Sequence, residues 1–322
     1  MVDKAHTNSY HAPGCIDAGL FIYYHFSGKI NNGAGINHLD ISSLHIERKL
    51  PPMKYLIAFA ALVILLLAYM FIQAMSYKTR HYELSGGAEF RFLHITDIHI
   101  GLLFISSSRI KNTIEETKPD FILISGDFLD RPKHIKKLEK WLKGIECGIP
   151  TYAVLGNHDH QCFKKYPNFK NEFMQLMKRL NIQILVNETV VLNDRNNSAA
   201  LALVGLDDCK SGVLFDKQIF EGLKNRYKFV LAFSHNPDAV LHVPEGSVSL
   251  FIAGHFHGGQ IWLPFKLEYM LLRKDKVSRM GHIKGLTYIR NNRVYISRGL
   301  GTVLVPFRFF SVPEVTVFNI KP

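Results

Sequence analysis

Five short motifs carry the side chains with which proteins most often bind metal ions. In chain order they read Asp-Ile-His, Gly-Asp-Phe-Leu-Asp, Gly-Asn-His-Asp, Ser-His-Asn-Pro and Gly-His-Phe-His. Imidazole and carboxylate groups together suit Zn, Fe or Mn, whereas sites built wholly of oxygen suit Mg or Ca. No cysteine lies among the motifs. The site they predict is therefore not a structural zinc site.

The number of candidate ligands indicates how many ions the motifs would hold. One tetrahedral ion needs about four ligands. The motifs supply seven, namely Asp97, His99, Asp127, Asn157, His235, His255 and His257. Seven ligands fit two ions if one carboxylate bridges them, and two ions about 3.5–4 Å apart form a clamp for phosphoryl transfer. Such a pair would lower the pKa of a shared water and neutralise charge on the transferring phosphoryl group.

The motif set resembles that of the calcineurin-like metallophosphoesterases, and the resemblance extends from about Phe90 to the C-terminus. It implies an α/β fold, a four-layer sandwich of two mixed β-sheets flanked by helices. It also implies two transition-metal ions, Mn, Fe or Zn. The ligands implied for the first metal are Asp97, His99 and His257. Those implied for the second are Asn157, His235 and His255, with Asp127 bridging both.

The resemblance also implies a catalytic pair. His158 matches the family's catalytic histidine, which meets the scissile phosphate and assists the leaving group, and Asp130 matches the carboxylate beside it. An imidazole can donate a proton near neutral pH, and a neighbouring carboxylate fixes its tautomer. Asp159 is the alternative partner for this histidine. Arg131 is a candidate phosphate contact, with a plain surface arginine as the alternative.

A finer resemblance links the chain to one bacterial branch of the family. The sequence Gly-His-Phe-His-Gly-Gly-Gln-Ile and the later Ser-Arg-Gly-Leu-Gly are similar to that branch. Its members carry one N-terminal anchor or export signal, and they include UDP-2,3-diacylglucosamine pyrophosphatases. This implies a bacterial inner-membrane protein. Phe256 stands where many members have Thr or Ser, so the pocket wall is expected to differ while the ligands do not.

Alternating strand and helix patterns are expected to position these motifs. The expected strands are 90–96, 121–125, 151–155, 199–205, 229–234 and 250–253, and the expected helices are 107–117, 133–143, 170–180 and 216–223. Residues 286–319 read as β-rich, with Asn291-Asn292 as a hairpin turn. Each motif follows the C-terminal end of a strand, where open α/β sheets bind their ligands.

An uncharged run of 21 residues, 55–75, precedes the motifs. As a helix it would reach roughly 31 Å, which is enough for a bilayer core. A soluble core helix would show a polar stripe, and a cleaved signal would have a shorter apolar region followed by small residues. We therefore expect a retained transmembrane helix at 55–75, a linker at 76–89 and a catalytic domain at 90–322.

Residues 1–52 lack sustained periodicity and are expected to be a disordered extension or the product of a misassigned upstream start. Arg48, Lys49 and Lys54 before the helix balance Lys78, Arg80 and Arg91 after it, so the positive-inside rule gives a tie. A start at Met53 would favour a cytoplasmic catalytic domain. Two basic amphipathic segments, 131–143 and 263–276, are candidates for contact with the bilayer surface, unless their apolar faces pack on the core.

These features predict a membrane-anchored, metal-dependent phosphoesterase that hydrolyses a phosphoester or pyrophosphate bond of an amphiphilic substrate. The formal net charge of +12 favours anionic partners. Two alternatives stay open: an enzyme acting on a soluble nucleotide, nucleic acid or phosphoprotein, and a metal-bound scaffold without catalysis. No aromatic stacking platform or nucleic-acid-binding module is visible in the sequence. A scaffold would not need His158. The substrate, metal identity and oligomeric state are left open.

Overall fold

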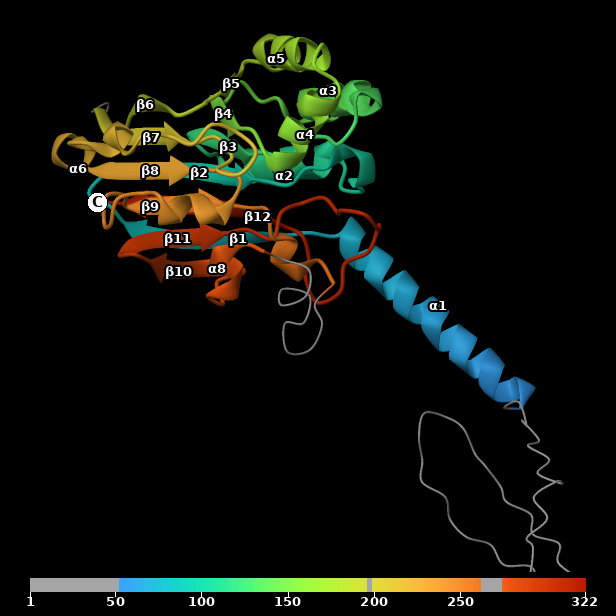
Figure 1. Cartoon of the computed structure of the whole chain (residues 1–322). Coiled ribbons are helices and arrows are strands. Elements are labelled where there is room, and N and C mark those ends of the chain that lie inside the picture. Colours follow the sequence, from blue (N-terminus) through green and yellow to red (C-terminus); the bar gives the residue numbers. More distant parts are fainter. Residues whose placement is uncertain (1–51, 196–198, 262–273) are drawn as a thin grey trace, which may run out of the picture. The chain divides into compact units, whose positions relative to one another are not determined.

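The computed structural model describes residues 52–195, 199–261 and 274–322 (Figure 1). The predictions for residues 1–51, and those for 263–273 within the second basic segment, lie outside these ranges. The chain divides into two compact units, residues 1–61 and 62–322. The second unit contains both sheets and every predicted site residue.

Six strands form the first sheet, in the order β1-β12-β2-β3-β4-β5. They are β1 (Lys78–Ser85), β2 (Phe90–Ile95), β3 (Phe121–Ser125), β4 (Thr151–Val154), β5 (Ile182–Ile184) and β12 (Glu314–Lys321). Strands β2 to β5 run parallel, and β12 is antiparallel to β2. Because Ile95 aligns with Ile124 and Ser125 with Val154, the strands β2, β3 and β4 end at the same edge.

The second sheet has the order β10-β11-β9-β8-β7-β6. Its strands are β6 (Glu188–Asn193), β7 (Ala199–Gly205), β8 (Phe229–Phe233), β9 (Leu250–Ala253), β10 (Gly285–Ile289) and β11 (Asn292–Ile296). The four inner strands are parallel, and the edge strands β6 and β10 are antiparallel to their neighbours. Both sheets are therefore mixed.

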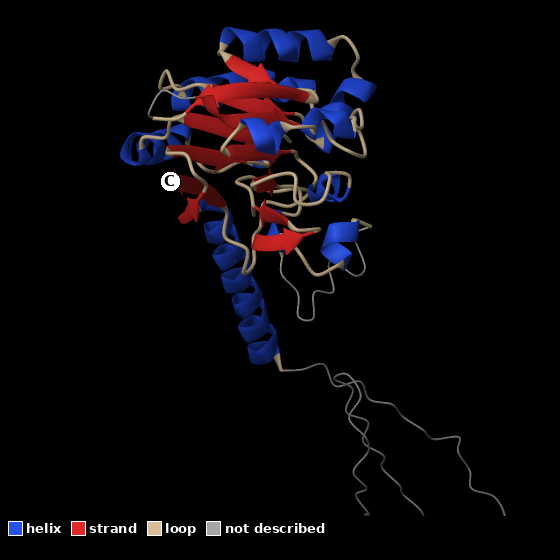
Figure 2. Cartoon of the chain, turned by 90° about the vertical axis from the view of Figure 1, so that its left-hand side faces the viewer, coloured by secondary structure: helices blue, strands red, loops and turns tan. Residues whose placement is uncertain are grey.

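Strand alternation divides the apolar side chains into layers. Phe92 and Phe121 of the first sheet pack with Leu231 and Phe233 of the second, between the two sheets. The other face of the first sheet packs against α2 (Ser107–Thr117), α3 (Ile135–Ile145), α4 (Asn157–Lys165) and α5 (Phe169–Arg179). The outer face of the second sheet packs against α6 (Leu223–Arg226), η4 (Pro237–Leu241) and α8 (Lys276–Arg279). Figure 2 shows the strands in red with helices in blue on both sides of them. This helix–sheet–sheet–helix sandwich confirms the predicted fold class.

Helix α3 contains most of the first basic amphipathic segment, and its apolar face packs on the core. Leu138, Trp141, Leu142 and Ile145 are buried. The indole Nε1 of Trp141 donates a hydrogen bond of 2.9 Å to the carbonyl oxygen of Ile105. These side chains are consequently not available to a bilayer, and the core-packing alternative describes this segment.

The linker prediction for residues 76–89 is wrong for 78–85, which form β1. This strand pairs in parallel with β12 from Lys78 opposite Glu314 to Ser85 opposite Lys321. Tyr82 and Leu84 contact the core between the sheets. The strand lies at the sheet edge, so half of its side chains face solvent and its sequence lacks the apolar run of a central strand.

Two further predictions fail at positions with left-handed backbone. The helix expected at 216–223 is broken into η3 (Lys217–Phe220) and α6, because Gly222 between them has φ 69°. The hairpin turn consists of Arg290 and Asn291, with φ of 51° and 57°, which is the pattern of a two-residue type I′ turn. Asn292 instead opens β11 opposite Ile289.

Helix α1 (Met53–Met75) is the one helix, among the described residues, that is long and apolar enough to cross a membrane. Its 23 residues span about 34 Å at about 1.5 Å per residue. At its C-terminal end Met70, Gln73 and Ala74 are buried within the second unit. Leu65 and Ile72 of the same helix are 67% and 63% exposed. The last turns of α1 are therefore part of the packed second unit.

Candidate metal centre

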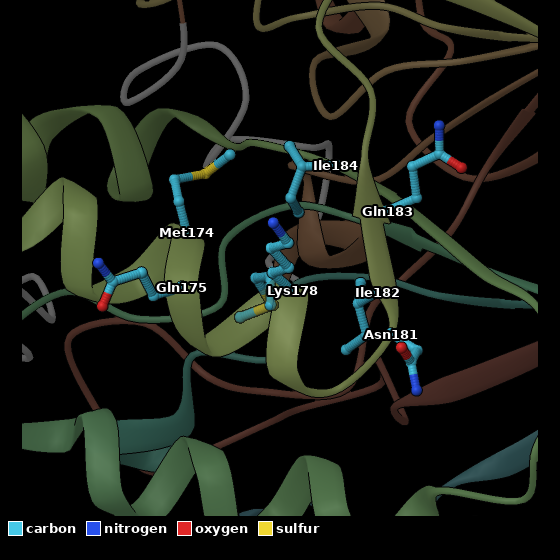
Figure 3. A pocket seen from close by; sticks show the side chains of 8 residues that line it. Met174, Gln175, Lys178, Asn181, Ile182, Gln183 and Ile184 are labelled. Atoms are coloured by element: carbon cyan, nitrogen blue, oxygen red, sulfur yellow. The ribbon is translucent and has the colours of Figure 1, made fainter.

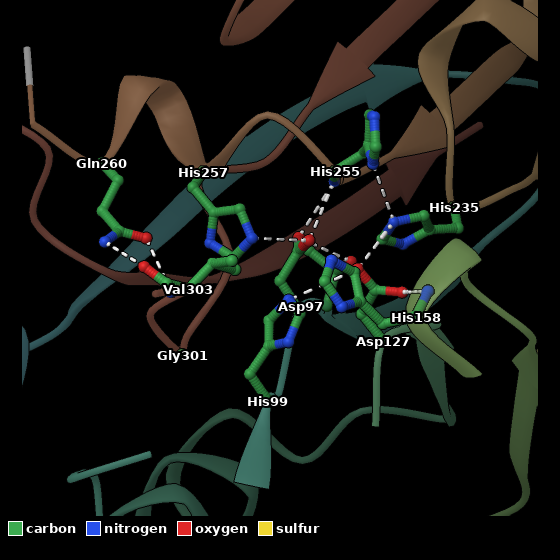
Figure 4. A network of polar contacts seen from close by, with 12 residues as sticks. Asp97, His99, Asp127, His158, His235, His255, His257, Gln260, Gly301 and Val303 are labelled. Carbon is green, nitrogen blue, oxygen red and sulfur yellow. Dashed lines mark hydrogen bonds and ion pairs between the residues drawn. The ribbon is translucent and has the colours of Figure 1, made fainter. Parts of the chain in front are cut away.

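The structure brings the seven predicted ligands together at the ends of β2, β3, β4, β8 and β9 (Figure 4). Each motif starts where a buried strand stops, so the strands fix the positions from which the side chains reach. Three groups, formed by six of these side chains and His158, have ligand atoms within 4.8 Å of one another, and two of the groups share Asp127. The members are Asp97, His99 and His257; His99, Asp127 and His158; and Asp127, His235 and His255.

The carboxylate of Asp127 lies at the centre of the cluster and is 1% exposed. Its Oδ2 atom is 3.3 Å from Nε2 of His99 and 3.1 Å from Nε2 of His235. Its Oδ1 atom accepts a hydrogen bond of 2.9 Å from the backbone N–H of His158. One oxygen thus faces ligand nitrogens from both halves of the site, as a bridging carboxylate must.

Asp97 connects the first motif to the last. Its Oδ1 atom is 3.3 Å from Nε2 of His257, and its two oxygens accept the backbone N–H of His255 at 3.0 and 3.1 Å. The hydroxyl of Thr96 donates to Oδ2 at 3.0 Å. These bonds hold a fully buried carboxylate in one orientation beside His257.

His235 is oriented by its second ring nitrogen. Its Nδ1 lies 2.8 Å from the carbonyl oxygen of Ser125, to which it donates. In that tautomer the other nitrogen, Nε2, presents a lone pair, the arrangement typical of metal-ligating histidines. Nε2 lies 3.0 Å from Oδ1 of Asn157 and 3.1 Å from Nδ1 of His255. The three predicted ligands of the second metal therefore point to one place.

The donor set fits divalent transition metals. It consists of imidazole nitrogens and carboxylate or amide oxygens, which is the mixture that Zn, Fe and Mn prefer. The Nε2 atom of His99 is buried and makes no hydrogen bond among the described residues. A buried polar atom without a hydrogen bond is costly, and a metal ion beside the Asp127 carboxylate would remove that cost.

Asp127 and the two imidazoles beside it, those of His99 and His235, shift one another's pKa values. Burial lowers the pKa values of His99 and His235, but the negative charges of nearby aspartates, Asp127 above all, outweigh it and raise both to about 10. Burial in turn raises the pKa of Asp127, and the two imidazoles hold it well below its ordinary value. A metal ion that binds here competes with protons for these nitrogens.

The backbone at the site is strained. Five of the candidate ligand residues have left-handed φ angles, namely Asp97 at 54°, His99 at 39°, Asp127 at 54°, His255 at 71° and His257 at 52°. Such conformations are uncommon for residues with a Cβ atom and cluster at functional sites, where the surrounding structure enforces them. The strain turns side chains at the strand ends towards one another.

Two glycines lie so close to carboxylates of the site that only a residue without a Cβ atom fits there. A Cβ atom on Gly156 would lie 2.1 Å from Oδ1 of Asp127. A Cβ atom on Gly254 would lie 2.3 Å from Oδ2 of Asp97. The glycine that opens the third motif and the glycine that opens the fifth are therefore steric requirements of the site.

Comparisons with known proteins agree with this geometry. A family model described as calcineurin-like phosphoesterase matches residues 90–259. The chain is 34% identical over 236 residues to YkoQ, an uncharacterized metallophosphoesterase of Bacillus subtilis, covering 71% of this chain and 82% of that protein. The chain belongs to the calcineurin-like phosphoesterase family.

Two relatives of this phosphoesterase have named activities. The phosphodiesterase YaeI of Escherichia coli is 30% identical over 241 residues, which cover 73% of this chain and 83% of YaeI. The UDP-2,3-diacylglucosamine pyrophosphatase LpxG of Chlamydia muridarum is 24% identical over 280 residues, which cover 71% of this chain and 83% of LpxG. The predicted family and the predicted class of enzyme, a metal-dependent hydrolase of phosphoric esters, are both confirmed.

Beside the candidate metal ligands of the phosphoesterase, His158 and Asp130 form a close pair. Nδ1 of His158 lies 2.6 Å from Oδ1 of Asp130, and the two side chains are 28% and 36% exposed. The alternative partner, Asp159, is fully buried and accepts the backbone N–H groups of Phe128 and Leu129 at 3.0 and 3.2 Å. The geometry thus favours Asp130 as the carboxylate that orients His158.

Arg131, the candidate phosphate contact, is exposed just before η2 (Pro132–His134). Two histidines outside the five motifs are held by tertiary contacts. His160 lies on α4 with its Nε2 2.6 Å from the buried Oδ1 of Asp207. His94 is fully buried with its Nε2 2.8 Å from the hydroxyl of Ser125.

Two supporting residues escaped the sequence analysis. Asp275 approaches Nε2 of His255 at 3.5 Å and also contacts Lys210. Arg308 is fully buried, and its guanidinium donates to carbonyl oxygens that include those of His257 and Arg298 at 3.0 and 2.9 Å. Neither residue lies in one of the five motifs, and their contacts with the site form only through tertiary folding. Arg308 does lie in a stretch, Pro306 to Phe310, that resembles the same bacterial branch, but the resemblance gives it no role.

A cavity of about 570 Å³ lies between α5 and β5 (Figure 3). Met174, Lys178, Ile182 and Ile184 are among the residues that line it. No ligand candidate lines this cavity, and its walls carry no histidine or carboxylate. It is separate from the candidate metal centre.

Proposed function

We propose that this phosphoesterase binds two transition-metal ions and hydrolyses a phosphoester or pyrophosphate bond in a membrane-associated, amphiphilic substrate. The observation that carries the chemistry is the central carboxylate of Asp127. It lies within 3.3 Å of imidazole nitrogens from both halves of the site. A single buried metal would not need a carboxylate placed in this way.

The proposed ligand roles are those that the family resemblance implies, and the clusters of Asp97, His99 and His257 and of Asp127, His235 and His255 support them. Asp97, His99 and His257 would bind one ion, and Asn157, His235 and His255 the other, with Asp127 shared. When bound, two such ions would supply charge neutralisation for the phosphoryl group and acidify the attacking water. The chain's own contribution is to hold these side chains in place before the substrate arrives, through buried carboxylates and enforced backbone angles.

His158 is the proposed proton donor to the leaving group. Its backbone N–H donates to Asp127 and its ring donates to Asp130, so the imidazole is fixed beside the shared ligand. With Nδ1 bound to Asp130, the free Nε2 is the atom that would meet the scissile bond. Arg131, which is exposed next to this pair in the sequence, is the proposed contact for a phosphate oxygen.

The membrane part of the proposal is supported by the length and composition of α1. Its last turns pack into the catalytic unit, so an anchor at residues 55–75 would hold the metal centre close to the bilayer. The name of the relative LpxG, a pyrophosphatase of a diacylated UDP-sugar, supports an amphiphilic substrate of this kind. We further propose a bacterial inner-membrane location with the catalytic domain on the cytoplasmic side.

A first experiment tests the metal chemistry. The purified full-length protein in detergent should hydrolyse an aryl phosphodiester or monoester with Mn added and lose activity with chelator. Asp127→Ala should lose both ions by metal analysis, because the bridging carboxylate serves both. Glu172→Gln, an exposed change on α5, is the matched control and should retain them. Full activity after exhaustive metal removal would contradict the proposal.

A second experiment tests the substrate. A variant that begins at Met70 keeps the buried Met70, Gln73 and Ala74 but lacks most of the anchor. It should lose activity on an ester embedded in vesicles, because confinement in the bilayer raises the effective concentration, and keep its activity on a small soluble ester. If both activities are unchanged, the substrate is soluble and the anchor serves location alone.

A further inference from the structure

An exposed apolar loop borders the metal centre on the side of α1. In this segment, residues 303–310, which we term the rim loop, Leu304 is 92% exposed, Phe310 59% and Val305 38%. Leu304 and Phe310 also have left-handed backbone, with φ of 64° and 52°. Left-handed conformations are unfavourable for bulky residues, so the fold holds these apolar side chains outward against both solvation and backbone preference.

Hydrogen bonds hold the rim loop to residues of the site. The side-chain amide of Gln260, three residues after His257, donates to the carbonyl oxygen of Val303 at 2.8 Å and accepts from the N–H of Val303 at 2.8 Å (Figure 4). The N–H of Phe309 donates to the backbone oxygen of Gln260 at 2.8 Å. The buried guanidinium of Arg308 binds the carbonyl oxygen of His257 at 3.0 Å.

The same loop contacts the end of the bilayer-length helix. The backbone N–H of Arg308 donates to the carbonyl oxygen of Met70 at 3.1 Å. The rings of Tyr69 and Phe309 meet edge to face, with centroids 6.2 Å apart. Figure 1 shows this red segment beside the C-terminal end of α1. The exposed side chains of the rim loop therefore lie level with the last turns of α1.

A second aromatic contact lies at the same end of α1. Phe104, which is 36% exposed, meets the ring of Phe71 with centroids 5.1 Å apart. Aromatic side chains gather where a transmembrane helix leaves the hydrocarbon. An exposed apolar patch that continues the apolar surface of such a helix is suited to lipid.

We propose that the rim loop inserts into the boundary between the headgroups and acyl chains of the bilayer that α1 spans. The proposal rests on the proposed anchoring by α1 and adds a second, separate point of contact. Two contacts fix the orientation of the catalytic unit, whereas a single helix would leave it free to rotate. Because Gln260 and Arg308 tie the loop to His257, the metal centre then opens at the membrane surface, where a lipid-linked phosphate lies.

The test measures insertion with tryptophan probes in the full-length protein, reconstituted into phosphatidylcholine vesicles. Leu304→Trp and Phe310→Trp place a probe at the exposed positions of the rim loop. Val191→Trp is the matched control, because Val191 is 44% exposed on β6, far from the end of α1 (Figure 1). Vesicles of brominated phosphatidylcholine should quench the two loop probes and leave the control unquenched, after subtraction of the signal of the unsubstituted protein.

Equal quenching at all three positions, or none at the loop, would overturn the proposal. Emission from the loop probes that is shifted to the blue but insensitive to bromination would show burial against a second copy of the chain, and would also overturn it. Alkaline extraction of the same vesicles examines α1 by itself. If alkali extracts the protein from the vesicles, both the proposed anchoring by α1 and this inference are contradicted. If the protein stays in the vesicles but the loop probes are not quenched, only this inference is contradicted. Metal-dependent hydrolysis in detergent is independent of both results.

Discussion

The contact between Asp130 and His158 allows a sharp test of proton donation. Asp130→Asn keeps the shape of the side chain and removes its charge. The carboxylate lies 2.6 Å from Nδ1 of His158 but also 3.4 Å from Nδ1 of His99. The shorter contact predicts that the change acts mainly on His158, while the longer one means that a metal ligand could be disturbed as well.

The expected magnitude follows from these contacts. A hydrogen bond to a charged group contributes about 1.5–3 kcal/mol, and about 1.4 kcal/mol corresponds to a factor of ten in rate. Because Asp130 is 36% exposed, solvent screening favours the lower end of this range. We expect kcat to fall roughly 10- to 30-fold. His158→Gln, which removes the donor itself, should cost roughly 10²- to 10⁴-fold.

The assay is a double-mutant cycle measured over aryl esters with good and poor leaving groups. If Asp130 acts through His158, the double variant should be no slower than His158→Gln, since groups that act as a unit are not additive. Both losses should shrink for good leaving groups, which need little protonation. Additive losses, or losses that ignore the leaving group, would refute the reasoning. Metal content must stay unchanged, because its loss would locate the effect at His99.

Two other predictions concern packing and pH. Gly156→Ala should lower metal content and activity, because its Cβ would lie 2.1 Å from Oδ1 of Asp127; Gly148→Ala, with nothing within 4 Å and φ +69°, should cost only roughly 1 kcal/mol of stability. Burial lowers the pKa of His160, but Asp207 outweighs it and raises the pKa above 6.5. The stability that the contact between His160 and Asp207 contributes is therefore fully present below about pH 6.5, and it is lost as the pH rises through the raised pKa of His160. The difference in free energy of unfolding between the unsubstituted protein and His160→Ala, measured by denaturant titration, should therefore become smaller as the pH rises. A difference that does not change with pH would contradict this prediction.

Most of the fold could be predicted because its central strands are buried on both faces. Such strands appear as continuous apolar runs, and 121–125, 199–205 and 250–253 were predicted with the observed bounds. Edge strands do not have this signature. Strand β1 is half exposed and polar, and its place beside β12 depends on pairing with residues more than 200 positions away. Left-handed positions such as Gly222 and Arg290 likewise depend on local backbone angles that composition does not specify.

The gathering of the ligands could be predicted for a related reason. Parallel strands end at one edge, so a motif after each strand places its side chains near the others. The sequence did not reveal how the ligands are held. Asp275 contacts His255 although it follows it by 20 residues in the chain, and Arg308 donates to the carbonyl oxygen of His257 from another loop. Such contacts are set by three-dimensional packing, and they involve residue types that are common on surfaces.

The site is built at a cost in stability that the rest of the fold offsets. Two aspartates, Asp97 and Asp127, are buried, and five ligand residues carry left-handed backbone at of order 1–3 kcal/mol each. The buried sheets on either side supply the apolar packing that keeps these angles in place. Metal ions that bind the folded site and not the unfolded chain would add stability by mass action. A chain with this arrangement should therefore unfold more readily after chelation, even though the metal ligands contribute little to its apolar core.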